Sequence, residues 1–194
     1  MQRFPLLLAL FFVCSATVWG QSVSLVDFNQ ATIDHQRTAM YALGGWALLN
    51  IGSGLALQGS ATGSTKSFHR MNALWNTVNL GIAGFGYLSL LKADAAGWDL
   101  TTSLSEHRKF QQLLLFNTGL DVGYVLGGLY LTERAKRPDA DADRLRGFGN
   151  SIMLQGAFLF AFDLVNYLIS AGRNGDLPLR LGATAEGLGL SLTF

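Results

Sequence analysis

The stretch LLFNTGLDVGYVLGGLYL, which runs from Leu114 to Leu131, decides the fold. It is almost wholly apolar over nearly the length, about 20 residues, that a helix needs to cross a bilayer. Asp121 nevertheless stands near its centre, and GAFLFAFDLVNYLIS at 156–170 repeats the pattern with Asp163. A carboxylate at mid-helix opposes insertion by about 2.5–3.5 kcal/mol. The two aspartates therefore need an explanation that apolar packing does not supply.

The composition excludes several classes of function. Of 194 residues, 49% are hydrophobic and only 14% are charged, whereas soluble domains carry about a quarter charged residues. The net charge is +1, and no basic run is longer than RAKR at 134–137, so we expect no nucleic-acid partner. The single cysteine, Cys14, lies in the N-terminal segment, which leaves the rest of the chain without a thiol. We therefore expect no cofactor.

The first residues have the pattern of a secretory signal. Arg3 precedes an apolar core from Leu6 to Val13, and small residues follow. These features predict a cleavable signal peptide over residues 1–20, with an uncleaved membrane anchor as the alternative. Residues 21–39 would then form an extracytoplasmic N-terminal segment.

Four further stretches predict an all-α membrane protein with a transmembrane domain at residues 40–171. The predicted spans are Met40–Gln58, Met71–Leu91, Phe110–Thr132 and Asn150–Ser170. A buried soluble bundle would need helices with charged outer faces, which these stretches lack. The matching phrases LNIG at 49–52 and LDVG at 120–123 suggest two duplicated helical hairpins.

The connectors contain helix-boundary signals. Ser103 and Glu106 have the spacing of a capping box, which predicts that the third helix begins there. Pro138 is expected to end that helix, and Asp139 to begin the next one.

The distribution of lysine and arginine predicts the orientation. With the N-terminus outside, the first and third connectors would be cytoplasmic, and they carry most of the Lys and Arg residues. We therefore expect a bacterial cytoplasmic membrane protein with both mature termini extracytoplasmic. In the tail, residues 172–194, leucine alternates with other residues from Leu177 onward, which predicts a short β-hairpin.

Each predicted span places an amide or a carboxylate near the bilayer midplane. Helical periodicity extends this layer into stripes, and the candidate polar site consists of Asn50, Asn76, Asn79, Asn117, Asp121, Gln155, Asp163 and Asn166. No Lys, Arg or His lies at that depth. The aspartates are therefore either neutral, or attended by a cation or a water-filled cavity.

A glycine stripe lies on the other side of the third predicted helix. A small residue at every fourth position lets another helix approach closely. We expect helix packing at Gly119, Gly123 and Gly127.

Three phrases of the chain resemble an uncharacterised bacterial family of small polytopic membrane proteins. They are FHRMNALWNTVNLGIAGFGY at 68–87, LLFNTGLDVGYVLGGLYL at 114–131 and RLRGFGNSIMLQGAFLFAFDLVNY at 144–167. The resemblance covers Met40 to Ile169. It implies a helical membrane protein of about four helices, and it implies no activity.

Two functions remain open from the sequence. The first is a structural or partner-binding membrane subunit held together by the Asn/Asp layer, with a second copy or another membrane protein as partner. The second is a small transporter or channel-like protein that uses Asp121 and Asp163 for a proton, a cation or a small polar ligand. We do not expect an enzyme or a metal centre, because the sequence contains no catalytic motif and its histidines lie outside the spans.

Overall fold

Four long helices and a two-stranded sheet make up the computed structural model, which describes residues 23–176, 179–184 and 187–192. The elements are α1 (Leu25–Gln58), α2 (Gly63–Leu90), α3 (Leu100–Arg134), α4 (Ala142–Gly172), a short 3₁₀ turn η1 (Arg173–Asp176), β1 (Leu179–Thr184) and β2 (Gly187–Leu192). The predicted signal peptide lies outside the described residues.

The helices are longer than the predicted spans. α1 has 34 residues, about 51 Å at 1.5 Å per residue, whereas the hydrocarbon core of a bilayer is about 30 Å thick. Its first turns therefore extend beyond the span predicted at Met40–Gln58. Most of the N-terminal segment that we expected at 21–39 belongs to this continuous helix, which Ser24 caps by accepting from the Asp27 amide at 3.1 Å.

Two predicted helix starts are wrong by a few residues. Asp99 caps α3, because its Oδ1 accepts from the Thr102 amide at 2.8 Å. Ser103 lies inside the first turn, where its hydroxyl donates to the Asp99 carbonyl and is buried. At α4 the cap is Asp141, which accepts from the Arg144 amide, and not Asp139.

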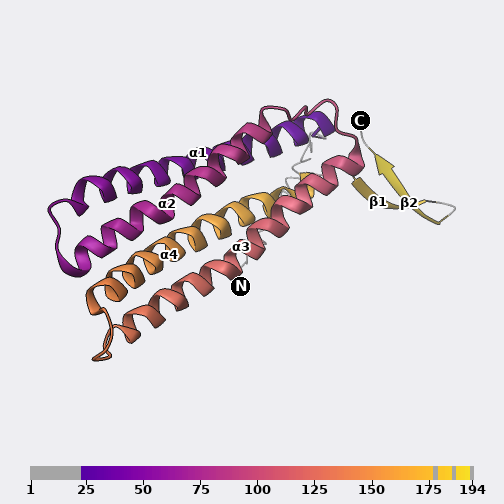
Figure 1. Ribbon diagram of the computed structural model, residues 1–194. Coiled ribbons are helices and arrows are strands. Elements are labelled where there is room, and N and C mark those ends of the chain that lie inside the picture. Colours follow the sequence, from indigo (N-terminus) through magenta and orange to yellow (C-terminus); the bar gives the residue numbers. More distant parts are fainter. Residues whose placement is uncertain (1–22, 177–178, 185–186, 193–194) are drawn as a thin grey trace, which may run out of the picture.

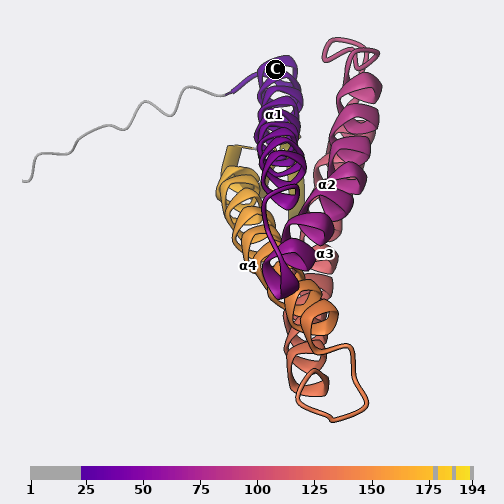
Figure 2. The same ribbon diagram turned by 60° about the vertical axis from the view of Figure 1, so that its left-hand side comes forward.

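The helices form two hairpins that lie side by side (Figures 1 and 2). α1 packs on α2, α3 packs on α4, and α2 joins the hairpins by packing on α4. Both hairpin connections lie at one end of the bundle, and the α2–α3 connection lies at the other (Figure 1). We call these the hairpin-turn end and the opposite end.

The distribution of polar residues is the reverse of that in a soluble protein. Asn76, Gln155 and Ser170 are completely buried, whereas Leu49 and Phe85 are 73% and 79% exposed. Large apolar side chains cover much of the outer surface of all four helices. Such a surface is compatible with a membrane protein.

By length and composition, three of the described helical stretches could cross a membrane: Leu25–Gln58, Leu100–Arg134 and Ala142–Asp176. Three of the four predicted spans thus lie in helices that are long and apolar enough to cross a membrane. α2 is not among them, because its inner face carries Asn72, Asn76 and Asn79 and its first turns carry charged residues.

The tail contains two short antiparallel strands. β1 pairs with β2 so that Leu181 lies opposite Leu190 and Gly182 opposite Gly189. The pair stands beyond the opposite end of the bundle (Figure 1). The remaining residues of the predicted hairpin, 177–178, 185–186 and 193–194, lie outside the described residues.

Candidate functional site

A network of amide side chains joins three helices at the centre of the bundle. Asn72 Nδ2 of α2 donates to Asn50 Oδ1 of α1 at 2.7 Å, and Asn72 Oδ1 accepts from Gln155 Nε2 of α4 at 2.5 Å. Gln155 Oε1 in turn accepts from Trp46 Nε1 at 2.8 Å. Buried amides are costly unless they are hydrogen-bonded, and here each satisfies another. This network ties α1, α2 and α4 together in one register.

The network continues along α2. Asn76 Nδ2 donates to the Asn72 carbonyl at 2.8 Å, and Asn79 Nδ2 donates to Asn76 Oδ1 at 3.2 Å. Asn72 and Trp46 were not among the predicted site residues. Asn72 lies on the predicted polar stripe of its helix, so its spacing could have identified it. The sequence gives no comparable signal for Trp46.

The two aspartates form a pair outside this network. Asp121 of α3 and Asp163 of α4 are 2% and 5% exposed, and both line the same pocket. The helices can approach because Gly156 stands where a Cβ would lie 3.0 Å from the Asp121 carbonyl oxygen. Asp121 Oδ2 is buried and has no hydrogen-bond partner among the described residues. The pair therefore has unused capacity to bind a proton or a donor group.

A pocket of about 140 Å³ opens beside the carboxyl pair. α2, α3 and α4 supply most of its lining, which includes the amides of Asn79 and Asn117 as well as both aspartates. α2 and α3 do not pack closely on each other. The pocket reaches the outer surface of the bundle beside Val78. No Lys, Arg or His from the described part of the chain lines it.

Two aromatic side chains stand over this pocket. The rings of Trp75 on α2 and Tyr124 on α3 meet edge to face with centroids 4.9 Å apart. They bridge the space between the two helices. Aromatic faces beside carboxylates favour cations over anions.

Asn166, which the sequence places on the polar face of the fourth helix, lies apart from the pocket and the amide network. Its Oδ1 accepts from His35 Nε2 at 2.9 Å, and its Nδ2 donates to the Phe162 carbonyl. The helical spacing from Asp163 is correct, but Asn166 is one turn closer to the opposite end. There it meets the part of α1 that extends beyond the predicted span.

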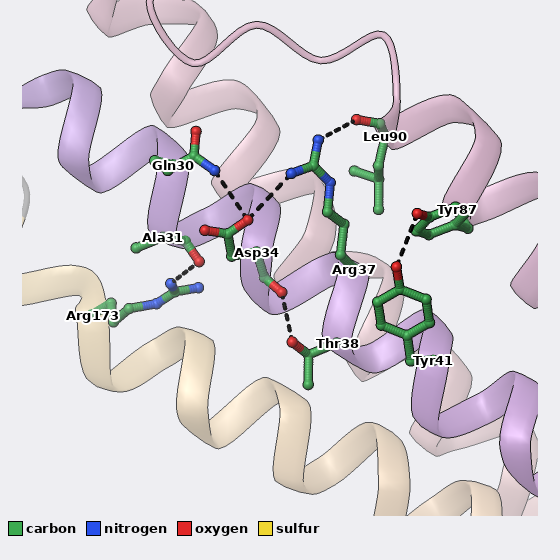
Figure 3. Close-up of polar contacts among 9 residues, drawn as sticks. All are labelled: Gln30, Ala31, Asp34, Arg37, Thr38, Tyr41, Tyr87, Leu90 and Arg173. Carbon is green, nitrogen blue, oxygen red and sulfur yellow. Dashed lines mark hydrogen bonds and ion pairs between the residues drawn. The ribbon is translucent and has the colours of Figure 1, made fainter.

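A second polar cluster closes the opposite end of the bundle. Arg173 of η1 donates to the Ala31 carbonyl (Figure 3). It also donates to His35 Nδ1 at 3.0 Å, and both contacts tie the end of α4 to α1. Since Nδ1 accepts, Nε2 carries the proton that is donated to Asn166. Burial lowers the pKa of His35; the hydrogen bond to Asn166 partly opposes this shift, and the charge of Arg173 adds a smaller lowering effect.

His107 takes part in a parallel set of contacts at the same end. Asn174 Oδ1 accepts from His107 Nε2 at 2.9 Å and from Gln111 Nε2 at 2.8 Å. Burial lowers the pKa of His107 as well. These contacts join α3 to η1. Together, the contacts of the two histidines connect α1 and α3 to the C-terminal end of α4 and to η1 at the opposite end of the bundle.

A further contact at this end links α1 to α2. Arg37 bridges Asp34 and the Leu90 carbonyl, and the hydroxyl groups of Tyr41 and Tyr87 are hydrogen-bonded at 2.9 Å (Figure 3). Both contacts stabilise the hairpin of α1 and α2.

The predicted glycine stripe does not pack within the bundle. A Cβ added to Gly119, Gly123 or Gly127 would meet no atom within 4 Å. Close helix contacts instead involve Gly128 and Gly156, which face α4 and α3 respectively. Gly149 of α4 also packs against α3, beside Thr132, so the glycines of the α3–α4 contact are not those of the predicted stripe, and the packing prediction is wrong within the single chain.

A small bundle with an apolar surface and an amide and carboxyl interior is compatible with the class of helical membrane proteins. The chain belongs to the family of unknown function DUF6992, whose model matches residues 42–164. The uncharacterised family that the sequence resemblance implied is thereby confirmed. Comparisons with curated proteins and with solved structures found no match. The matched residues contain the amide network and the carboxyl pair.

Proposed function

We propose that this protein is a multi-pass membrane protein whose carboxyl pair, Asp121 and Asp163, binds a proton, a cation or a small polar ligand within the bilayer. The apolar exterior and the three helices long enough to span support the membrane placement. The observation that carries the site is that no hydrogen bond among the described residues joins the pair to the amide network, although Asn79 of that network lines the same pocket. The amides satisfy one another, whereas Asp121 Oδ2 faces no donor in the described chain.

The energetics favour an occupant for this pair. Two ionised carboxylates at mid-helix would oppose insertion by roughly 5–7 kcal/mol on the insertion scale. An interhelical hydrogen bond contributes only about 0.6–2 kcal/mol. No cationic side chain of the described residues lines the pocket. A shared proton or a bound cation removes most of the charge, and either one gives the unpartnered oxygen a ligand.

The size of the pocket restricts the ligand. A volume of about 140 Å³ holds several water molecules, but it is below the roughly 300–1,000 Å³ of sites for drug-sized molecules. The ligand class is therefore a proton, a monovalent cation with part of its water shell, or a small ammonium group. Trp75 and Tyr124 suit the last two through their aromatic faces.

This role is one of binding or ion passage, and not of catalysis. The pocket offers two carboxyl and two amide groups, and its lining includes no serine, cysteine, lysine or histidine. We place the protein in a bacterial cytoplasmic membrane with both mature termini outside. The basic residues of the two connectors at the hairpin-turn end support that orientation.

A partner-binding subunit is the second candidate function. It is favoured by the exposed stripe Gly119, Gly123 and Gly127, which meets no other helix of the chain. Such a stripe allows close packing of a transmembrane helix from a second copy or another membrane protein. Cysteine crosslinking at Gly123 in membranes tests it, with Gly45 on the open face of α1 as control position. Crosslinked dimers at Gly123 alone would support this function.

Thermal stability in neutral detergent tests the carboxyl pair. Purified parent protein is titrated with Na⁺, K⁺ and methylammonium at several pH values. A ligand present at 100 times its Kd stabilises by about 2.7 kcal/mol. We expect one cation to stabilise the parent, and we expect the contribution of the carboxyl pair to stability, measured as the difference between the parent and its Asn variants, to grow as pH falls. Asp121→Asn and Asp163→Asn, which keep shape and hydrogen bonding, should lose that response.

The matched control is Asp139→Asn, an exposed aspartate in the α3–α4 connection. It should respond as the parent does. If the Asn variants of the pair also respond as the parent does, the ion site is wrong and a structural role for the pair is preferred.

A further inference from the structure

Four arginines gather where the two hairpin connections meet. Asp143 at the start of α4 lies against Gly63 at the start of α2, which brings the two connections into contact. Two adjoining pockets, of about 320 and 510 Å³, share Arg144 and Phe148. Their basic lining residues are Arg70, Arg134, Arg137 and Arg144.

These arginines have no carboxylate partner among the described residues. The ion pairs among the described residues involve other basic residues, namely Arg37, Lys109 and Lys136. Two aspartates, Asp139 and Asp141, also line the pockets, but Asp141 is engaged in capping α4. Four arginines against two aspartates leave the surface positive, and hence suited to an anion.

Apolar side chains lie directly beside the charges. The Arg144 guanidinium stands over the Phe148 ring at 5.5 Å from its centroid. Leu131 and Leu74 line the same two pockets, and Leu74 is 62% exposed. The arginines lie just beyond the ends of the predicted spans, at the depth of lipid headgroups. A ligand that fits must carry an anionic head and an apolar body.

We propose that the cluster of Arg70, Arg134, Arg137 and Arg144 binds the phosphate of an anionic phospholipid, with the acyl chains against Leu74, Leu131 and Phe148. Guanidinium groups bind phosphate oxygens in a bidentate manner. A soluble phosphate would use the same guanidinium groups but gain nothing from the apolar side chains. The inference rests on the membrane placement proposed above, but not on the carboxyl pair.

Native mass spectrometry of the full chain in neutral detergent measures lipid retention directly. Phosphatidylglycerol and phosphatidylcholine with identical acyl chains are compared, with glycerol 3-phosphate as the soluble phosphate. We expect preferential binding of phosphatidylglycerol, reduced at raised ionic strength. Each basic residue near an anionic lipid surface contributes enough for about a fivefold change in affinity. Arg137→Gln and Arg144→Gln should therefore each weaken binding about fivefold.

The matched control is Lys136→Gln, because Lys136 is adjacent in sequence but paired with Glu133. It should leave lipid binding close to that of the parent. Equal binding of the two lipids, competition by glycerol 3-phosphate at concentrations similar to the lipid, or an equal loss in Lys136→Gln would each overturn the proposal. Because Arg137 and Arg144 are exposed, their variants should fold. A negative result for lipid binding would not bear on the proposal for the carboxyl pair, whereas a protein that did not insert into membranes would contradict both proposals.

Discussion

Two neighbouring glycines of α3 allow a sharp test of the packing. Gly127→Ala adds a methyl group that meets nothing within 4 Å. It should stabilise the protein by up to about 1 kcal/mol, because alanine is the better helix former. Gly128→Ala adds the same methyl group 2.6 Å from the Gly149 carbonyl oxygen and 2.9 Å from the Met153 amide. Those are backbone atoms, so α3 and α4 must separate.

Overpacking of this kind costs about 1–3 kcal/mol. Both variants gain the helix preference of alanine, so they should differ in free energy of unfolding by the overpacking cost, roughly 1–3 kcal/mol. Chemical unfolding in mixed detergent micelles, followed by tryptophan fluorescence, measures the difference. If Gly128→Ala proves as stable as Gly127→Ala, the α3–α4 interface described here is wrong. A changed oligomeric state in Gly127→Ala alone would instead favour a partner on the open stripe.

Gln155→Met removes an amide that is hydrogen-bonded to both Asn72 and Trp46. It should destabilise the protein by about 1–4 kcal/mol in the same unfolding assay. The control Gln112→Met, at an exposed position, should leave the stability unchanged. The contribution of His35 to stability should fall as pH drops below about 6.5, the ordinary pKa of histidine, which is opposite in sign to the contribution expected from the carboxyl pair. The reason is that the folded protein disfavours the His35 proton, which the unfolded chain binds freely. His35→Gln should flatten that pH profile, whereas His69→Gln at the hairpin-turn end should not. Topology reporters should read cytoplasm after Ser64 and Asp141, and the outside after Ala95 and Asn174.

Each of these expectations has a distinct contrary result. Equal stability of the two glutamine variants would show that the amide network contributes little. If the stability of His35→Gln depends on acid pH as that of the parent does, other groups cause the dependence, and His107 would be the first to examine. An inverted pair of reporters would overturn the proposed orientation.

The polar interior was predictable from the sequence because helical periodicity assigns faces. Asn72, Asn76 and Asn79 are spaced to lie on one side of α2, and all three are buried. The same reasoning placed Asp121 and Asp163 at a common depth, where they meet. Periodicity does not determine which helix a face contacts, however. The pairing of Asn72 with Asn50 and Gln155 depends on the α2–α4 contact, and nothing in the local sequence specifies it.

The glycine stripe and Asn166 show the same limit. Gly119, Gly123 and Gly127 have the spacing of a packing motif, but the glycine that faces α4 is Gly128, which lies two turns from Asp121 on the same face of α3. Asn166 was assigned to the candidate polar site on its helical face alone. Its partner, His35, lies in the part of α1 that precedes the predicted span, and the sequence prediction did not include that part in the helix.

Carbodiimide labelling tests the central claim most directly. Dicyclohexylcarbodiimide is apolar and reacts with protonated carboxyl groups in membranes, so exposed ionised aspartates are not labelled. With the protein in liposomes, we predict modification at Asp121 or Asp163, less of it at high pH, and protection by the cation that stabilises the protein. Labelling should be absent from the double Asn variant. If the parent is not labelled at the pair at any pH, or if labelling is the same in the double variant, the carboxyl pair is not an intramembrane proton or cation site.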